Sequence, residues 1–204
     1  MSDFIIGLDL GQVQDYTALT IIEKVYPPDE EHLYHLRHIE RFPLHTSYPD
    51  VVDKVKEYLK SFQTYDSVYL VIDSTGVGLG IMDMFIIEYL YPIGITITGG
   101  TEINRDGDNY KVPKRDLVTC LQILFQTERL KIAKNLRHVD TLIQEFSNFR
   151  VKITTKGNDT YEAWREGQHD DLVLSVALAC WYGENTHPCF MIMEEPLVEG
   201  VFEF

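Results

Sequence analysis

The first part of the chain alternates between apolar, strand-like segments and polar, turn-like ones. Two polar sequences, GQVQDY and PPDEE, separate three segments that are rich in β-branched and other apolar residues. The predicted strands lie at about 4–10, 17–25 and 33–42. Because the connections between them are short, the three strands are expected to form an antiparallel meander.

A helix, a strand, a second helix and a further strand are predicted next. Apolar residues recur at helical spacing from Tyr48 to Phe62, which predicts an amphipathic helix. The nearly continuous apolar run SVYLVID, residues 67–73, is typical of a central strand that is covered on both faces. A glycine-rich turn leads into a helix over about 78–90, and IGITIT, residues 93–98, predicts a short strand. The order up to this point is βββαβαβ.

The second half of the chain is predicted to be mainly helical. The polar sequence GGTEINRDGDNYK is expected to be a loop, and a helix follows over 113–127 with proline at its start. Another helix is predicted near 137–147. The sequence FRVKITTKGNDTYEAW then predicts two strands joined by a KGND turn, followed by a last helix over about 170–182. The acidic and apolar segment at about 187–204 is expected to be a C-terminal tail.

Length and composition are those of one soluble globular domain. A chain of 204 residues, 1–204, fits a single hydrophobic core. Its apolar runs fall short of the roughly 20 residues that a membrane helix needs. No charged segment followed by an apolar one opens the chain, so we expect no export and no membrane contact. The three cysteines form no CxxC pair, which argues against a disulfide framework or a thiolate zinc site.

The net charge of −14 argues against a nucleic-acid partner when it is taken alone. The charge is unevenly distributed, however. Between Arg105 and Arg165 the sequence has 12 Lys and Arg residues against 8 Asp and Glu residues, which makes this stretch basic. An acidic protein with one basic stretch can still hold an anionic polymer on one face.

Three groups of acidic residues fall at the ends of predicted elements: Asp9 near the end of the first strand, Asp73 at the end of the fourth, and Asp170 with Asp171 at the start of the last helix. Ligands collect at the carboxyl ends of strands in open α/β sheets. If the first and fourth strands are neighbours, Asp9 and Asp73 lie within a few ångströms of each other. Two carboxylates about 4 Å apart repel by roughly 4 kcal/mol at an effective dielectric constant near 20. Divalent cations would offset that repulsion, and hard oxygen ligands predict two Mg²⁺ or Mn²⁺ ions, with Asp9 bridging them.

Each of these acids also has a structural interpretation. Asp9 is suited to cap a turn at the end of a strand, and Asp73 precedes Ser-Thr-Gly and is suited to a turn or a helix cap. Asp170 and Asp171 stand where aspartate is a preferred N-cap and favours the helix dipole. One of these two residues is therefore expected to serve the helix rather than a metal ion.

Four sequence motifs carry a resemblance to a known family: GLDLGQVQDYTAL, VIDSTGVG, VPKRDLVT and GQHDDLVLSVALA. In this order they resemble the motifs of the C-terminal nuclease domain of phage large terminases, a member of the RNase H-like superfamily, and they span the chain from Phe4 to Tyr182. The resemblance implies an α/β fold with an RNase H-like mixed central sheet. Its first strands would form the antiparallel meander, its later strands would be parallel, helices would flank it, and an extra β-hairpin would precede the last helix.

The resemblance also implies site residues and a reaction. The acids that match Asp9, Asp73 and Asp171 bind two metal ions in that family, and those that match Asp15 and Asp170 sometimes assist. Such domains are endonucleases that hydrolyse phosphodiester bonds of double-stranded DNA by a two-metal mechanism when packaging begins and ends. His169, which directly precedes the acidic pair, is a candidate for ordering a water molecule or relaying a proton.

Basic residues are candidates for contact with the DNA backbone. Three of them flank the N-terminus of the helix predicted over 113–127, where free N–H groups and the dipole favour phosphate, and three lie on or beside the predicted hairpin. The first three are Lys111, Lys114 and Arg115, and the second three are Lys152, Lys156 and Arg165.

A complete large terminase also carries an ATPase domain with a P-loop, and the sequence has no GxxxxGK[ST] motif. We therefore expect a terminase ATPase domain or subunit as a partner, together with the small terminase and the portal, and a location in the host cytoplasm if the protein is viral. Two alternatives within the same fold are a Holliday-junction resolvase and a non-catalytic module of packaging assembly. An actin-like ATPase, for which GLDLG would be a phosphate-binding hairpin, usually needs two such subdomains.

Overall fold

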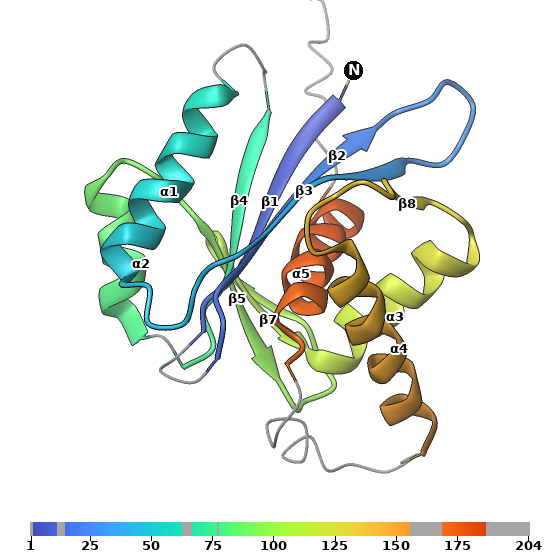
Figure 1. Cartoon of the computed structure of the whole chain (residues 1–204). Helices are drawn as coiled ribbons and strands as arrows, with labels where there is room; N and C mark the ends of the chain where they lie inside the picture. Colours follow the sequence, from blue (N-terminus) through green and yellow to red (C-terminus); the bar gives the residue numbers. More distant parts are fainter. Residues whose placement is uncertain (1, 12–14, 63–66, 77, 156–168, 187–204) are drawn as a thin grey trace, which may run out of the picture.

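The computed structural model describes residues 2–11, 15–62, 67–76, 78–155 and 169–186, and Figure 1 shows their arrangement. The strands are β1 (Ser2–Asp9), β2 (Ala18–Val25), β3 (Leu33–Arg41), β4 (Val68–Asp73), β5 (Ile93–Thr98), β6 (Asn104–Asp106), β7 (Asn109–Pro113) and β8 (Leu130–Ile132). The helices are α1 (Tyr48–Ser61), α2 (Gly78–Ile87), α3 (Lys114–Gln126), α4 (Val139–Thr155) and α5 (Asp171–Asn185).

The strands form one mixed sheet in the order β6-β7-β5-β4-β1-β2-β3-β8. β1, β2 and β3 are the predicted antiparallel meander. β4 pairs with β1 in parallel, β5 continues in parallel from β4, and β7 continues in parallel from β5. The predicted fold class, a mixed sheet whose early strands are antiparallel and whose later strands are parallel, is confirmed.

Helices cover both faces of the sheet and enclose two hydrophobic clusters (Figure 1). On one face α1 and α2 pack against β1 and β4, with Val55 and Phe85 fully buried. On the other face α5 lies directly on β1 and β2, and α3 and α4 pack against α5. α5 is apolar around its whole circumference, which is expected of a helix enclosed by a sheet and other helices.

Side chains along β1 point alternately to the two faces of the sheet. Ile6 and Leu8 belong to the cluster under α1 and α2, whereas Ile5 belongs to the cluster under α5. Because the strand period is two, Gly7 and Asp9 point to the α5 face as well. At Gly7 the backbone of α5 comes so close that an added Cβ would lie 2.0 Å from the carbonyl oxygen of Ser175.

Three segments differ from the prediction. The sequence GGTEINRDGDNYK, expected to be a loop, contains β6 and the start of β7, because Tyr110 and Val112 alternate as buried residues beside β5. The short strand β8, which pairs with β3, was not expected. Helix α4 continues through residues 149–155, so the first strand of the predicted hairpin is wrong, and its second strand lies outside the described residues.

The longer α4 has a physical reason in its own periodicity. Leu142 and Phe146 are one helical turn apart, and both pack in the cluster around α5. Burial of this stripe favours a helix over the β-propensity of the residues that follow. Among the described residues, no helix is both long enough and apolar enough to span a lipid bilayer.

Candidate active site

Asp9 and Asp73 lie side by side at one edge of the sheet. β1 and β4 are parallel, and Leu8 pairs with Ile72, so the next residue of each strand is one of the two acids. The first and fourth strands are therefore neighbours, which is the condition on which the expected closeness of Asp9 and Asp73 depended. Both side chains are 9% exposed. The backbone N–H of Thr75 donates to Asp73 Oδ1 at 2.7 Å, so Asp73 also stabilises the turn that follows its strand.

The N-terminus of α5 brings two further acids to the same region. Asp170 is the N-cap residue, but its side chain makes no capping hydrogen bond, and Asp171 is the first helical residue and is buried. Asp170 therefore occupies the predicted N-cap position, although it does not cap the helix through its side chain. Glu145 of α4 takes that role, because its Oε2 accepts hydrogen bonds from the backbone N–H groups of Leu172 and Val173 at 3.0 and 3.2 Å.

The electrostatics show that these carboxylates interact. The pKa of Asp9 is raised well above its usual value, first by burial and then by the negative charges of Asp73, Asp171 and Asp170, while Lys114 acts in the opposite direction. Acids that are far apart in the sequence are thus close enough in the fold to disfavour ionisation of one another.

Two further carboxylates with raised pKa values lie at the N-terminus of α5. Burial raises the pKa of Asp171, and the hydrogen bond and charge of Arg41 oppose that shift. Burial likewise raises the pKa of Glu145, to about 7, against the charge of Arg41 and the two backbone hydrogen bonds. Perturbed carboxylates of this kind are concentrated at functional sites, although structural ion-pair networks also produce them.

Arg41 is the cation at the centre of this group, and the sequence analysis missed it together with Glu145. Its Nη2 lies 2.6 Å from Asp171 Oδ2 and 3.3 Å from Glu145 Oε1. Two patterns point to these residues. Arg41 follows the buried Ile39 by two positions on β3, and Glu145 follows the buried Leu142 by three positions on α4, so both belong to faces that turn inward.

The auxiliary residues are exposed at the rim of the site. Asp15 lies between β1 and β2, and its charge contributes to the raised pKa of Asp171. His169 Nδ1 lies 3.8 Å from Asp171 Oδ2, and the His169 ring meets the ring of Tyr16 edge to face at 5.0 Å. His169 therefore lies beside Asp171, and Asp15 lies close enough for its charge to act on Asp171.

The basic candidates divide into two sets. Lys114, at the start of α3, points toward the acids, with its Nζ 3.8 Å from Asp170 Oδ2, while Lys111 on β7 is exposed. Arg115 is half exposed and interacts with Asp116 and with the carbonyl oxygen of Thr101. Of the second set, Lys152 lies in α4, but its side chain is outside what the structure describes, and Lys156 and Arg165 lie outside the described residues.

The acids supply the right donor atoms for a divalent cation but not a closed cage. Among the described residues, no group of three His, Cys, Asp or Glu side chains has the arrangement of a metal site. Asp171 is held by Arg41 instead. The chemistry of the set nevertheless fits a hard cation, because its members are carboxylate oxygens. Burial, and then the charges of the other acids, raise the pKa of Asp9.

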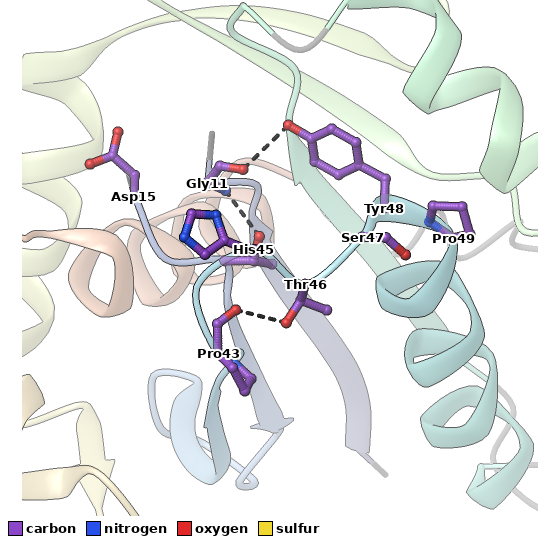
Figure 2. Close-up of a pocket in the computed structure, with 9 residues that line it drawn as sticks. Gly11, Asp15, Pro43, His45, Thr46, Ser47, Tyr48 and Pro49 are labelled. Atoms are coloured by element: carbon purple, nitrogen blue, oxygen red, sulfur yellow. Dashed lines mark hydrogen bonds between the residues drawn. The ribbon is translucent and has the colours of Figure 1, made fainter. Parts of the chain in front are cut away.

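A pocket of about 620 Å³ is lined by Gly11, two residues after Asp9, by Asp15 and by residues at and before the start of α1. Figure 2 shows His45 near its centre, with Asp15 on one side and Tyr48 on the other. The Tyr48 hydroxyl donates to the carbonyl oxygen of Gly11 at 3.3 Å, which joins the start of α1 to the segment that follows Asp9. The pocket is lined by Gly11, Asp15, Thr17, Pro43, His45, Thr46, Ser47, Tyr48 and Pro49.

No family model matches the sequence. The chain is 26% identical over 183 residues to the terminase large subunits of Thermus virus P23-45 and Thermus phage G20c, and these matches cover 86% of the chain. The chain spans about a third of the length of these curated relatives, with 31% of each covered.

Solved structures show the same architecture. The large terminase nuclease of thermophilic phage G20c with bound zinc matches with a TM-score of 0.56 and 20% identity, over 90% of this chain and 81% of that one. The manganese-soaked human cytomegalovirus terminase nuclease domain matches with a TM-score of 0.56 and 12% identity, over 87% and 82%. The g2p (large terminase) nuclease domain of bacteriophage SPP1 with bound manganese matches with a TM-score of 0.52 and 13% identity, over 90% and 87%.

These matches cover most of the chain and share its fold. The resemblance predicted from the sequence is confirmed, and the chain has the RNase H-like fold of the nuclease domains of large terminases.

Proposed function

We propose that this protein is a divalent-metal-dependent endonuclease that cuts double-stranded DNA as the nuclease part of a viral packaging terminase. The observation that carries the proposal is the convergence of Asp9, Asp73 and Asp171 from two parallel strands and a helix. The pKa of Asp9 is raised in part by the other two acids. Neighbouring folds described with bound zinc or manganese support the use of a divalent ion.

Asp9, Asp73 and Asp171 would hold the metal ions, with Asp9 shared between them and Asp170 assisting. When bound, a pair of Mg²⁺ or Mn²⁺ ions supplies charge stabilisation for both the entering and the leaving oxygen of a phosphodiester hydrolysis. The stiff ends of β1 and β4 keep two of the ligands in place during the reaction. His169 stands at the exposed side of Asp171 and is proposed to order a water molecule or relay a proton at its ring nitrogen.

Contact with the DNA backbone is assigned to the start of α3. Lys111 and Arg115 are exposed there, and Lys114 connects this region to the acids through Asp170. The remaining candidates, Lys152, Lys156 and Arg165, stay predictions from the sequence.

The relatives extend well beyond the matched region, since it covers 31% of their length. We therefore propose that the nuclease works with a terminase ATPase domain or subunit, and with the small terminase and the portal, in the cytoplasm of an infected host. Two structures of the large terminase from another thermophilic bacteriophage, one of them in complex with ADP, match this chain over 39% of their length and support that arrangement.

Incubation with supercoiled plasmid tests the proposed activity. The protein should nick and linearise the plasmid in Mn²⁺ or Mg²⁺, and EDTA should abolish cutting. Asp73→Asn should be inactive, because the amide keeps the shape of the side chain but is a weaker ligand, while Asp106→Asn, on the exposed strand β6, should cut normally.

Equal cutting by Asp73→Asn and the unmodified protein would refute the assignment. Preferential cleavage of a synthetic four-way junction over linear duplex would favour a junction resolvase. A folded protein that binds no Mn²⁺ and cuts nothing would favour a non-catalytic assembly module.

A further inference from the structure

The pairing register places Arg41 in the same row of the sheet as Asp9. Asp9 pairs with Ala18 of β2, and Ala18 pairs with Arg41 of β3. Paired residues on adjacent strands point to the same face, so Asp9 and Arg41 both point toward α5. Two strand spacings of about 4.8 Å each separate their backbones. Asp171, at the N-terminus of α5, interacts with both residues: it accepts a hydrogen bond from Arg41, and its charge acts on Asp9.

The guanidinium of Arg41 is enclosed and oriented. Its side chain is 13% exposed, and its guanidinium carbon lies 4.0 Å from the centre of the Tyr16 ring. From that position Nη2 donates to Asp171 Oδ2 at 2.6 Å. Hydrogen bonds of this kind between charged groups are short and strongly directional, so they restrict the orientation of the carboxylate.

Glu145 connects the same guanidinium to the backbone of α5. Its Oε1 lies 3.3 Å from Arg41 Nη2, and its Oε2 accepts from the N–H groups of Leu172 and Val173. Arg41 therefore holds the Asp171 side chain, and Glu145 holds the helix terminus.

We propose that Arg41, tied to α5 by Glu145, is a positioning residue that holds Asp171 through Oδ2 and so orients its carboxylate for a divalent cation. The inference rests on the proposed metal-dependent function and adds to it the residue that orients one ligand. Partners of this kind, which hydrogen-bond to a metal ligand, typically change metal affinity by about 10–100-fold when they are replaced.

Mn²⁺ titration of the full chain tests the proposal, with the dissociation constant measured by calorimetry or by the electron paramagnetic resonance of free Mn²⁺. Arg41→Met should weaken Mn²⁺ binding by about tenfold or more, and Arg41→Lys should recover part of the loss, because lysine keeps the charge without the planar group. Arg37→Met is the matched control, because Arg37 lies on the same strand, is about half exposed and pairs with Glu23 away from the acids. It should leave the Mn²⁺ affinity unchanged.

A metal-free measurement tests whether Arg41 and Asp171 interact in the folded protein. In EDTA, the thermal midpoints of Arg41→Met, Asp171→Asn and the double variant should be non-additive, because each single variant breaks the same ion pair. If Arg41→Met does not fold, Arg41→Lys decides through the same two measurements.

Three outcomes would overturn the inference. Unchanged Mn²⁺ affinity in Arg41→Met and Arg41→Lys would show a role limited to stability, and tighter Mn²⁺ binding would show that Arg41 competes with the cation. Additive midpoints would show that the ion pair is not formed. If the unmodified protein binds no Mn²⁺, it is the proposed function that fails, and this result is distinct from normal binding that the Arg41 variants leave unchanged.

Discussion

Replacing Gly7 with alanine should displace helix α5 from the sheet and move Asp171 with it. The added Cβ would lie 2.0 Å from the carbonyl oxygen of Ser175 and 3.2 Å from the Cβ of Ala179. A carbon and a carbonyl oxygen need about 3.3 Å, so the strand and the helix must separate by more than about 1 Å. The obstacle is helix backbone, which has no alternative rotamer.

The size of the effect follows from the packing. Overpacking a well-packed interior costs about 1–3 kcal/mol, and a clash with backbone belongs at the upper end of that range. For a chain of this length, about 3 kcal/mol corresponds to a decrease of about 6–12 °C in the unfolding midpoint. Because the N-terminus of α5 carries Asp171, plasmid cutting should also fall at temperatures where the variant remains folded.

Thermal unfolding followed by circular dichroism, together with the plasmid assay, checks this expectation. Gly80→Ala is the matched control, because Gly80 lies in α2 and nothing stands within 4 Å of the position of its Cβ. Alanine is the better helix former, so this variant should be slightly more stable and fully active. A Gly7→Ala protein that melts with the unmodified protein and cuts equally fast would refute the close approach of β1 and α5.

Three further predictions concern charge and hydrogen bonding. Burial raises the pKa of Glu145 from 4.5 to about 7, so the folded metal-free protein binds the extra proton, and up to about 3 kcal/mol of stability should be lost as the pH rises from about 4.5 through 7. Glu145→Gln should flatten that loss in thermal melts recorded in EDTA, and an unchanged pH profile would contradict it. Combined Lys114→Ala and Arg115→Ala should reduce the salt slope of DNA affinity by about two in a log–log plot, measured by fluorescence anisotropy, and an unchanged slope would remove both from the DNA contact. Tyr34→Phe deletes the 2.7 Å hydrogen bond to Glu184 at the far end of α5, so it should cost about 1–2 kcal/mol in urea unfolding while plasmid cutting stays normal.

The sequence predicted the elements whose periodicity is local and strong. The meander, the buried strand that ends at Asp73 and the last helix all have patterns that depend on neighbouring residues only. The residues of 149–155 favour a strand by type, but the segment continues helix α4, whose Leu142 and Phe146 pack against the core. β7 was missed because its polar composition hid the two buried positions that pair beside β5.

The candidate site was predictable to the extent that its acids stand at the ends of elements. Asp9 and Asp73 lie where the strand order places them, and Asp171 lies at the start of α5. Arg41 and Glu145 were not predictable from spacing alone, because their roles depend on β3 and α4 approaching the same helix terminus. Charged residues on inward faces were the available signal.

The separation of the acids along the sequence has a consequence for protein synthesis. Asp9 and Asp73 belong to strands that can pair early, but Asp171 leaves the ribosome only after most of the domain has been translated. At about 5–20 residues per second, the interval between Asp73 and Asp171 takes several seconds. A truncated translation product that stops before α5 also lacks the helix that covers Gly7 and Ile5. Under the proposed function, incomplete chains that end before α5 therefore do not cut DNA, because they lack Asp171.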